Sequence, residues 1–253
     1  MISERPAKLT RRQAANVADA EMGAFYDVLV SLDAGDWALE TGRDGVTVRA
    51  VVAHVCGQYQ EIARPATLLR RIGLARRRYP ERGVLDGRDQ VRLDDLASLD
   101  PDALVAHFAR YGPAAIRAMR RMPGLLRRVP AQKLFPDSSL AEPDVGYLVD
   151  VIAPRDTWIH RLELARATGV VFEVDVHDEA IVAQVVRDLH AGWHGRPLRL
   201  ELAGPAGGAW SIGRGPAIGV VQADALGMMR HLAGRDGLDL PEGSPLEGAR
   251  VVF

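Results

Sequence analysis

Apolar side chains recur at helical spacing over four long stretches in the first two thirds of the chain. They fall three and four positions apart, which is typical of helices that bury one face. We expect Gly112 and Pro113 to interrupt the third helix and Pro154 to kink the fourth. The predicted helices lie at residues 10–32, from residue 48 onward, from residue 101 onward and at residues 146–168.

The pattern changes after Gly169, where short alternating segments and glycine-rich turns replace long helices. Alternation of apolar and polar residues predicts strands, and two helical patterns lie among them. The segments are predicted strands at 170–176, 198–202 and 209–212, and predicted helices at 178–189 and 223–232. We therefore expect an α-helical N-terminal domain, a four-helix bundle at residues 1–169, and a small α+β domain at residues 170–253.

Bulk composition describes a soluble globular protein. The 253 residues are 47% hydrophobic and 26% charged, with a formal net charge of −1. This balance argues against a nucleic-acid partner, since neutralising phosphates needs a basic excess. No apolar run is long enough to span a bilayer, so we expect no membrane association. The single cysteine, Cys56, cannot form an internal disulfide, which fits the cytoplasm. The oligomeric state is left open.

Residues 64–128 carry an unusual arginine load. They contain 15 arginines and no lysine, against seven acidic residues. The favoured interpretation is a set of solvated helix faces and a loop. The alternative is a surface that attracts an anionic substrate or partner.

The candidate chemistry centres on Asp156 and His160, which lie four apart within the fourth predicted helix. On a helix this spacing places both side chains on one face, about one turn apart. The pair can bind a divalent cation, or it can be an ordinary acid–histidine pair. Spacing alone does not decide, because it recurs at Glu173 with His177 and at His190 with His194. Neither of those pairs lies within a long helical pattern.

His54 shares a helical stripe with Val51, Gln58 and Glu61. A single histidine at such a position is more often a core residue with a satisfied hydrogen bond than a ligand. Cys56 lies two positions on, about 200° around the helix, so we expect it to pack rather than to join His54. Gln58 and Glu61 could orient the His54 side chain without acting as ligands themselves.

The segment from Arg155 to Ala165 resembles a metal-binding motif of mycothiol-dependent maleylpyruvate isomerase-like proteins, part of the DinB-like four-helix superfamily. That motif runs approximately Arg-x-x-Glu-x-x-x-His-x-x-Asp-Leu-Ala and ends in glycine. The family's first motif, a loop tryptophan followed by a helix with Val-x-x-His, resembles Trp37 and the segment from Val51 to His54. The resemblance implies that His54, Asp156 and His160 bind one divalent metal. Aspartate at 156 is a departure, since the family commonly has glutamate.

Members of this family often carry a sterol-carrier-like α+β domain at the C-terminus. Its last helix ends in a Gly-Arg pair, which resembles Gly234 and Arg235. The resemblance therefore implies a sterol-carrier-like domain at residues 170–253. It also makes Arg235 a candidate catalytic residue that binds a substrate carboxylate. The alternative for Arg235 is a surface arginine near the last helix carbonyls.

Two imidazoles and one carboxylate leave coordination positions open, as in catalytic sites. Zinc is the preferred metal, and nickel, cobalt, manganese and iron accept the same ligands. The resemblance implies mycothiol as the thiol cosubstrate and a small electrophilic, carboxylate-bearing substrate. Isomerisation and thiol S-transfer both remain open. The alternative is a non-catalytic protein that keeps this fold for ligand binding or regulation.

Overall fold

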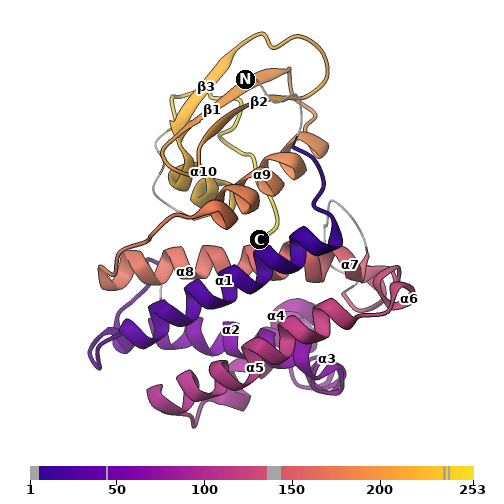
Figure 1. Ribbon diagram of the computed structural model, residues 1–253, viewed down its shortest axis with the longest axis vertical. Helices are drawn as coiled ribbons and strands as arrows, with labels where there is room; N and C mark the ends of the chain where they lie inside the picture. The colour runs from indigo at the N-terminus through magenta and orange to yellow at the C-terminus, as the bar shows by residue number, and fades with distance from the viewer. Residues whose placement is uncertain (1–5, 44, 136–143, 236–237, 239) are drawn as a thin grey trace. The chain divides into compact units, whose positions relative to one another are not determined.

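The computed structural model describes residues 6–43, 45–135, 144–235, 238 and 240–253. They form two compact units (Figure 1). One unit is Arg11–Phe172, and the other joins residues 6–10 to the segment from Glu173 onward. The first is helical and the second holds a small mixed sheet followed by a C-terminal helix, so the predicted fold class is confirmed. No helix among the described residues is long and apolar enough to cross a membrane.

Four long helices of the first unit match the predicted stretches: α1 (Arg11–Ser31), α2 (Val48–Ala63), α5 (Pro101–Arg121) and α8 (Ala153–Thr168). Their ends follow local chemistry. The Thr47 side chain accepts a hydrogen bond from the backbone of Ala50 and caps α2. Gly169 ends α8 with a φ of 79°, a left-handed conformation that glycine adopts without strain.

The arginine-rich region is more helical than its composition suggests. Between α2 and α5 it forms α3 (Pro65–Arg78) and α4 (Gly83–Leu96). Shorter helical turns complete the unit: η1 (Asp36–Ala38), η2 (Pro80–Arg82), α6 (Gly124–Arg127), η3 (Ala131–Lys133) and α7 (Val145–Tyr147).

Aromatic side chains fill the centre of the helical unit. Phe25 of α1 lies 5.1 Å from Phe108 of α5, measured between ring centroids, and Tyr59 of α2 lies 4.9 Å from Phe108. Trp37 is buried in the same core. Helix α8 packs against both α1 and α2, and Figure 1 shows α1 and α8 side by side. This packing brings residues about 100 positions apart onto facing helix surfaces.

The expected interruption of the third helix is wrong, whereas the expected kink in the fourth is untested. Gly112 and Pro113 do not interrupt α5, which is continuous. A Cβ at Gly112 would lie 3.0 Å from Met22 Sδ, so glycine there allows α1 and α5 to approach closely. The kink expected at Pro154 stays a prediction, and a π-helical segment at Leu148–Ile152 directly precedes α8. Pro154 itself occupies the first turn of α8, where a missing N–H is tolerated.

The second unit consists of α9 (Val176–Ala191), a three-stranded sheet and α10 (Ala225–Leu232). Strand β1 (Leu198–Ala203) pairs antiparallel with β2 (Gly208–Ile212), so the two strands form a hairpin. Strand β3 (Val220–Asp224) pairs with β1 in parallel, so the order is β2-β1-β3.

The sequence pattern misplaced two boundaries in this unit. Residues 170–176 are not a strand: Asp175 caps α9 and forms a capping box with Asp178, which recruits Val176 into the helix. The helix predicted from residue 223 begins at Ala225, because Ala223 and Asp224 belong to β3.

Candidate metal centre

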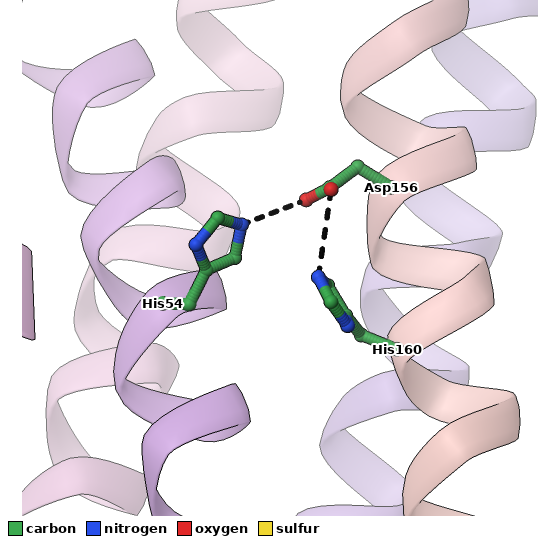
Figure 2. A group of neighbouring side chains, drawn as sticks. All are labelled: His54, Asp156 and His160. Atoms are coloured by element: carbon green, nitrogen blue, oxygen red, sulfur yellow. Dashed lines mark hydrogen bonds and ion pairs between the residues drawn. The ribbon is translucent and has the colours of Figure 1, made fainter. Parts of the chain in front are cut away.

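Three side chains from two helices meet inside the helical unit. His54 projects from α2, and Asp156 and His160 project from α8 (Figure 2). His54 Nε2 lies 3.2 Å from Asp156 Oδ2, and His160 Nε2 lies 3.5 Å from Asp156 Oδ1. The two imidazole ring centroids are 5.0 Å apart. The structure thus brings together the three residues that the resemblance named.

The starting points of α2 and α8 set the positions of the three side chains. Thr47 sets the start of α2, so His54 lies two turns inside it. Asp156 lies in the first turn of α8 and His160 in the next. The side chains of His54 and Asp156 are 19% and 17% exposed, whereas that of His160 is 5% exposed. The group is therefore mostly buried, and His160 is its least exposed member.

The charges of these residues stabilise one another. Burial opposes the ionisation of Asp156, but the adjacent His160 and His54 outweigh it and hold the pKa of the carboxyl well below its usual range. Burial likewise opposes protonation of His160, yet the Asp156 charge and hydrogen bonds to Asp156 and Glu163 raise the pKa of the ring to about 9. The metal-free protein therefore holds a proton on His160 at neutral pH.

The same distances suit a bound cation. Zinc binds nitrogen and oxygen ligands at roughly 2.0–2.2 Å, so the ligand atoms of a tetrahedral site lie about 3.3 Å apart. The separations of 3.2 and 3.5 Å, which run to the two different oxygens of Asp156, are close to that value. One donor atom from each residue lies within 4.8 Å of the others. The residues present therefore fit a divalent metal with two nitrogen ligands and one oxygen ligand.

Two further carboxylates lie on the Nδ1 side of the imidazoles, and neither was predicted from the sequence. Glu163 Oε2 is 2.7 Å from His160 Nδ1, and Arg43 Nη2 is 3.4 Å from the same oxygen. Asp89 Oδ2 of α4 is 3.9 Å from His54 Nδ1. Glu163 could have been found from the sequence, because it lies three positions after His160 on one helix face. No spacing rule connects Asp89 to His54.

Buried ion pairs occupy part of the arginine-rich region, so its interpretation as solvated helix faces is wrong for Arg71 and Arg92. Arg92 donates to both carboxylate oxygens of Glu61, at 3.0 and 2.6 Å, and Arg71 donates to Glu61 at 3.2 Å. Burial raises the pKa of Glu61, but the charges of Arg92, Arg88 and Arg71 lower it overall. This cluster ties α2, α3 and α4 together.

The remaining candidates near His54 have structural partners. Gln58 donates to the backbone oxygen of Ala153 at 3.0 Å, so it links α2 to the start of α8. Cys56 is buried and lies 3.5 Å from the backbone oxygen of Leu104, and burial raises the pKa of its thiol. The expected packing role of Cys56 is confirmed.

Arg235 belongs to the second unit and follows α10. Its Nη1 donates to the backbone oxygen of Ala233 at 3.3 Å, a contact with a carbonyl at the helix end. Its backbone N–H donates to the backbone oxygen of Arg230 at 2.8 Å. A role in binding substrate stays a prediction.

Comparison with protein families assigns the helical unit. The model of the mycothiol maleylpyruvate isomerase N-terminal domain matches residues 18–165, more than half of the chain. The chain belongs to this family. The matched range contains His54, Asp156 and His160, so the three residues lie within the family domain. No curated protein sequence matches the chain.

Two solved structures resemble this chain over more than the matched domain. A crystal structure of a mycothiol-dependent maleylpyruvate isomerase has a TM-score of 0.59 and 19% sequence identity, covering 92% of this chain and 96% of the other. A histidine-to-alanine mutant of a mycothiol-dependent maleylpyruvate isomerase has a TM-score of 0.55 and 18% identity, with the same coverage. At this identity the likeness establishes the shared fold.

Proposed function

We propose that the protein is a divalent-metal-dependent enzyme that uses a low-molecular-weight thiol as nucleophile. The single observation that carries the proposal is the convergence of His54 from α2 with Asp156 and His160 from α8. These three would be the metal ligands, with zinc preferred and nickel, cobalt, manganese or iron compatible with the same donors. Membership of the family, and the thiol named for the similar structures, support mycothiol as the cosubstrate.

A divalent cation at this position would lower the pKa of a thiol, so that thiolate is available near neutral pH. The protein would supply the ligands of this cation. These are the Asp156 carboxylate and the two imidazoles, and the low exposure of His160 would limit the access of water that competes with the thiol for the cation. The protein thiol of Cys56 is buried in the core and has no part in the reaction.

The proposed substrate is a small electrophile with a carboxylate, on which the thiol acts by isomerisation or by S-transfer. The similar structures are named as maleylpyruvate isomerases, which supports this substrate class. We also propose that residues 1–169 form the metal-binding domain and residues 170–253 a sterol-carrier-like domain. Arg235 is the proposed partner of the substrate carboxylate, because a guanidinium matches a carboxylate with two hydrogen bonds.

Metal analysis and turnover test the proposal together. The purified protein is loaded with zinc, dialysed and assayed for bound metal beside His54→Ala, His160→Ala and the control His107→Ala. His107 lies on α5, outside the group of three. We expect stoichiometric zinc in the wild type and the control, and loss of zinc in the other two variants. Wild-type protein without bound zinc would refute the metal centre.

Turnover is then measured with mycothiol and either maleylpyruvate or chlorodinitrobenzene. Maleylpyruvate reports isomerisation and chlorodinitrobenzene reports S-transfer. We expect zinc-dependent and thiol-dependent activity with at least one of them, and its loss in His160→Ala. Zinc binding without any turnover would favour the non-catalytic alternative. Arg235→Lys should raise the KM for maleylpyruvate more than it lowers kcat, because lysine keeps the charge but not the paired hydrogen bonds.

A further inference from the structure

The two imidazole rings of the candidate metal centre have the same orientation relative to Asp156. Each directs Nε2 toward Asp156, and each directs Nδ1 toward a different carboxylate. His160 Nδ1 lies 2.7 Å from Glu163 Oε2, and His54 Nδ1 lies 3.9 Å from Asp89 Oδ2. Only the first of these distances is that of a hydrogen bond.

This orientation matters because an imidazole binds a metal through one nitrogen while the other carries the hydrogen. Which nitrogen carries it depends on the hydrogen bond that the other atom makes. A carboxylate that accepts from Nδ1–H leaves the Nε2 lone pair free for a cation and fixes the plane of the ring. The geometry at His160 meets both requirements.

Glu163 is itself held in place. Its side chain is buried, and Arg43 Nη2 lies 3.4 Å from the oxygen that faces His160. Residues 156, 160 and 163 are spaced by four and three positions, so their side chains share one face of α8. A buried carboxylate needs such partners, because an uncompensated charge in the interior is strongly destabilising.

We propose that Glu163 is a positioning residue of the metal centre, which accepts the Nδ1–H of His160 and so presents Nε2 of that ring to the cation. The inference rests on the proposed function, since it requires that the three residues bind metal. Glu163 is not a ligand: its carboxylate lies on the Nδ1 side of the ring, while the candidate ligand atom Nε2 faces Asp156.

Asp89 provides an internal comparison. It lies beyond hydrogen-bond distance from His54, and its Oδ1 accepts from Arg92 at 2.9 Å and from Arg88 at 3.1 Å. Its charge is therefore engaged by two guanidinium groups. The structure thus predicts unequal contributions, with Glu163 strongly coupled to its imidazole and Asp89 weakly coupled.

Zinc affinity measured by competition with a chromophoric chelator tests this difference. The proteins are the wild type, Glu163→Leu, Glu163→Gln and Asp89→Asn. Leucine keeps the side-chain volume but cannot accept a hydrogen bond, whereas glutamine keeps a neutral acceptor. We expect Glu163→Leu to weaken zinc binding by about 10- to 100-fold. Glu163→Gln should fall between it and the wild type, and Asp89→Asn should lose no more than about fivefold.

A nitrogen-15 NMR spectrum of the zinc-loaded proteins supplies a readout that general destabilisation does not move. In the wild type the Nδ1 of His160 should carry a slowly exchanging hydrogen, and Nε2 should show the shift of a metal-bound nitrogen. The exchange should become faster in Glu163→Leu and be partly restored in Glu163→Gln. Circular dichroism identifies any variant that fails to fold, and in that case the Glu163→Gln result decides.

Two failures can be told apart. Wild-type protein that binds no zinc would overturn the proposed function and this inference with it. Wild-type protein that binds zinc, with both Glu163 variants binding equally well and the His160 Nδ1–H exchanging as before, would overturn the inference alone.

Discussion

The pairing of Asp156 with His160 makes the stability of the metal-free protein depend on pH in a defined direction. The pKa of His160 is about 9, compared with 6.5 for an unperturbed histidine, because Asp156 outweighs the effect of burial. A group whose folded-state pKa is raised binds its proton more tightly when folded. Its contribution to stability is therefore fully present below pH 6.5 and is lost as the pH rises through 9.

The expected size follows from this pKa difference. Each pH unit of difference between the folded and unfolded states corresponds to about 1.36 kcal/mol, so a change from 6.5 to about 9 corresponds to about 3 kcal/mol. Asp156 acts in the opposite sense. Its lowered pKa contributes stability that is present above about pH 4 and is lost as the pH falls through the folded-state value.

Urea unfolding of chelator-treated protein at pH 6.5 and pH 9.5 measures the contribution of His160. Between these pH values, the unfolding free energy of the wild type should fall by about 3 kcal/mol more than that of Asp156→Asn. The variant lacks the charge that raises the His160 pKa. An NMR titration should place the pKa of His160 near 9. His107, whose pKa burial and the charges of Arg71 and Arg110 lower to about 4, serves as an internal reference. Equal losses in both proteins, with His160 titrating near 6.5, would refute the reasoning.

Three substitutions test the framework around the centre by urea unfolding. Glu61→Gln should destabilise by about 3–5 kcal/mol, because it leaves two buried guanidiniums short of a counter-charge; a loss below 1 kcal/mol would contradict the importance of this cluster. Gly57→Ala should cost about 1–3 kcal/mol, because a Cβ there would lie 2.9 Å from Arg92 Cγ; an unchanged urea midpoint would mean that Arg92 can move. Thr47→Ala should cost about 1 kcal/mol through loss of the α2 cap while leaving zinc stoichiometry unchanged, and a loss of zinc would contradict this separation.

Helical periodicity predicted the parts of the fold that depend on local information. The four long helices follow from apolar spacing and from caps such as Thr47 and Asp100. Periodicity failed where tertiary contacts decide. Gly112 lies inside the continuous α5, where it allows close approach of Met22 from another helix, and β3 is defined by its pairing with β1.

The candidate site divides in the same way. Asp156 and His160 could be paired from their spacing, since a helix fixes their relative positions. The addition of His54 came from the family resemblance, because no property of α2 alone says which helix it faces. Asp89 could not be predicted from the sequence for the same reason, since its proximity to His54 depends on how α4 packs against α2.

Asp156 would have different electrostatic roles in the metal-free and metal-bound states of the proposed centre. Without metal it accepts from both imidazoles, and one ligand atom of each of the three residues lies within 4.8 Å of the others. Binding of a cation by these three residues would require removal of the proton from His160, because a metal ligand must be a neutral imidazole. With a pKa of about 9, that proton would lower the apparent affinity about 100-fold at pH 7 relative to full deprotonation. The carboxylate that keeps the two imidazoles close together would thus make metal binding strongly dependent on pH.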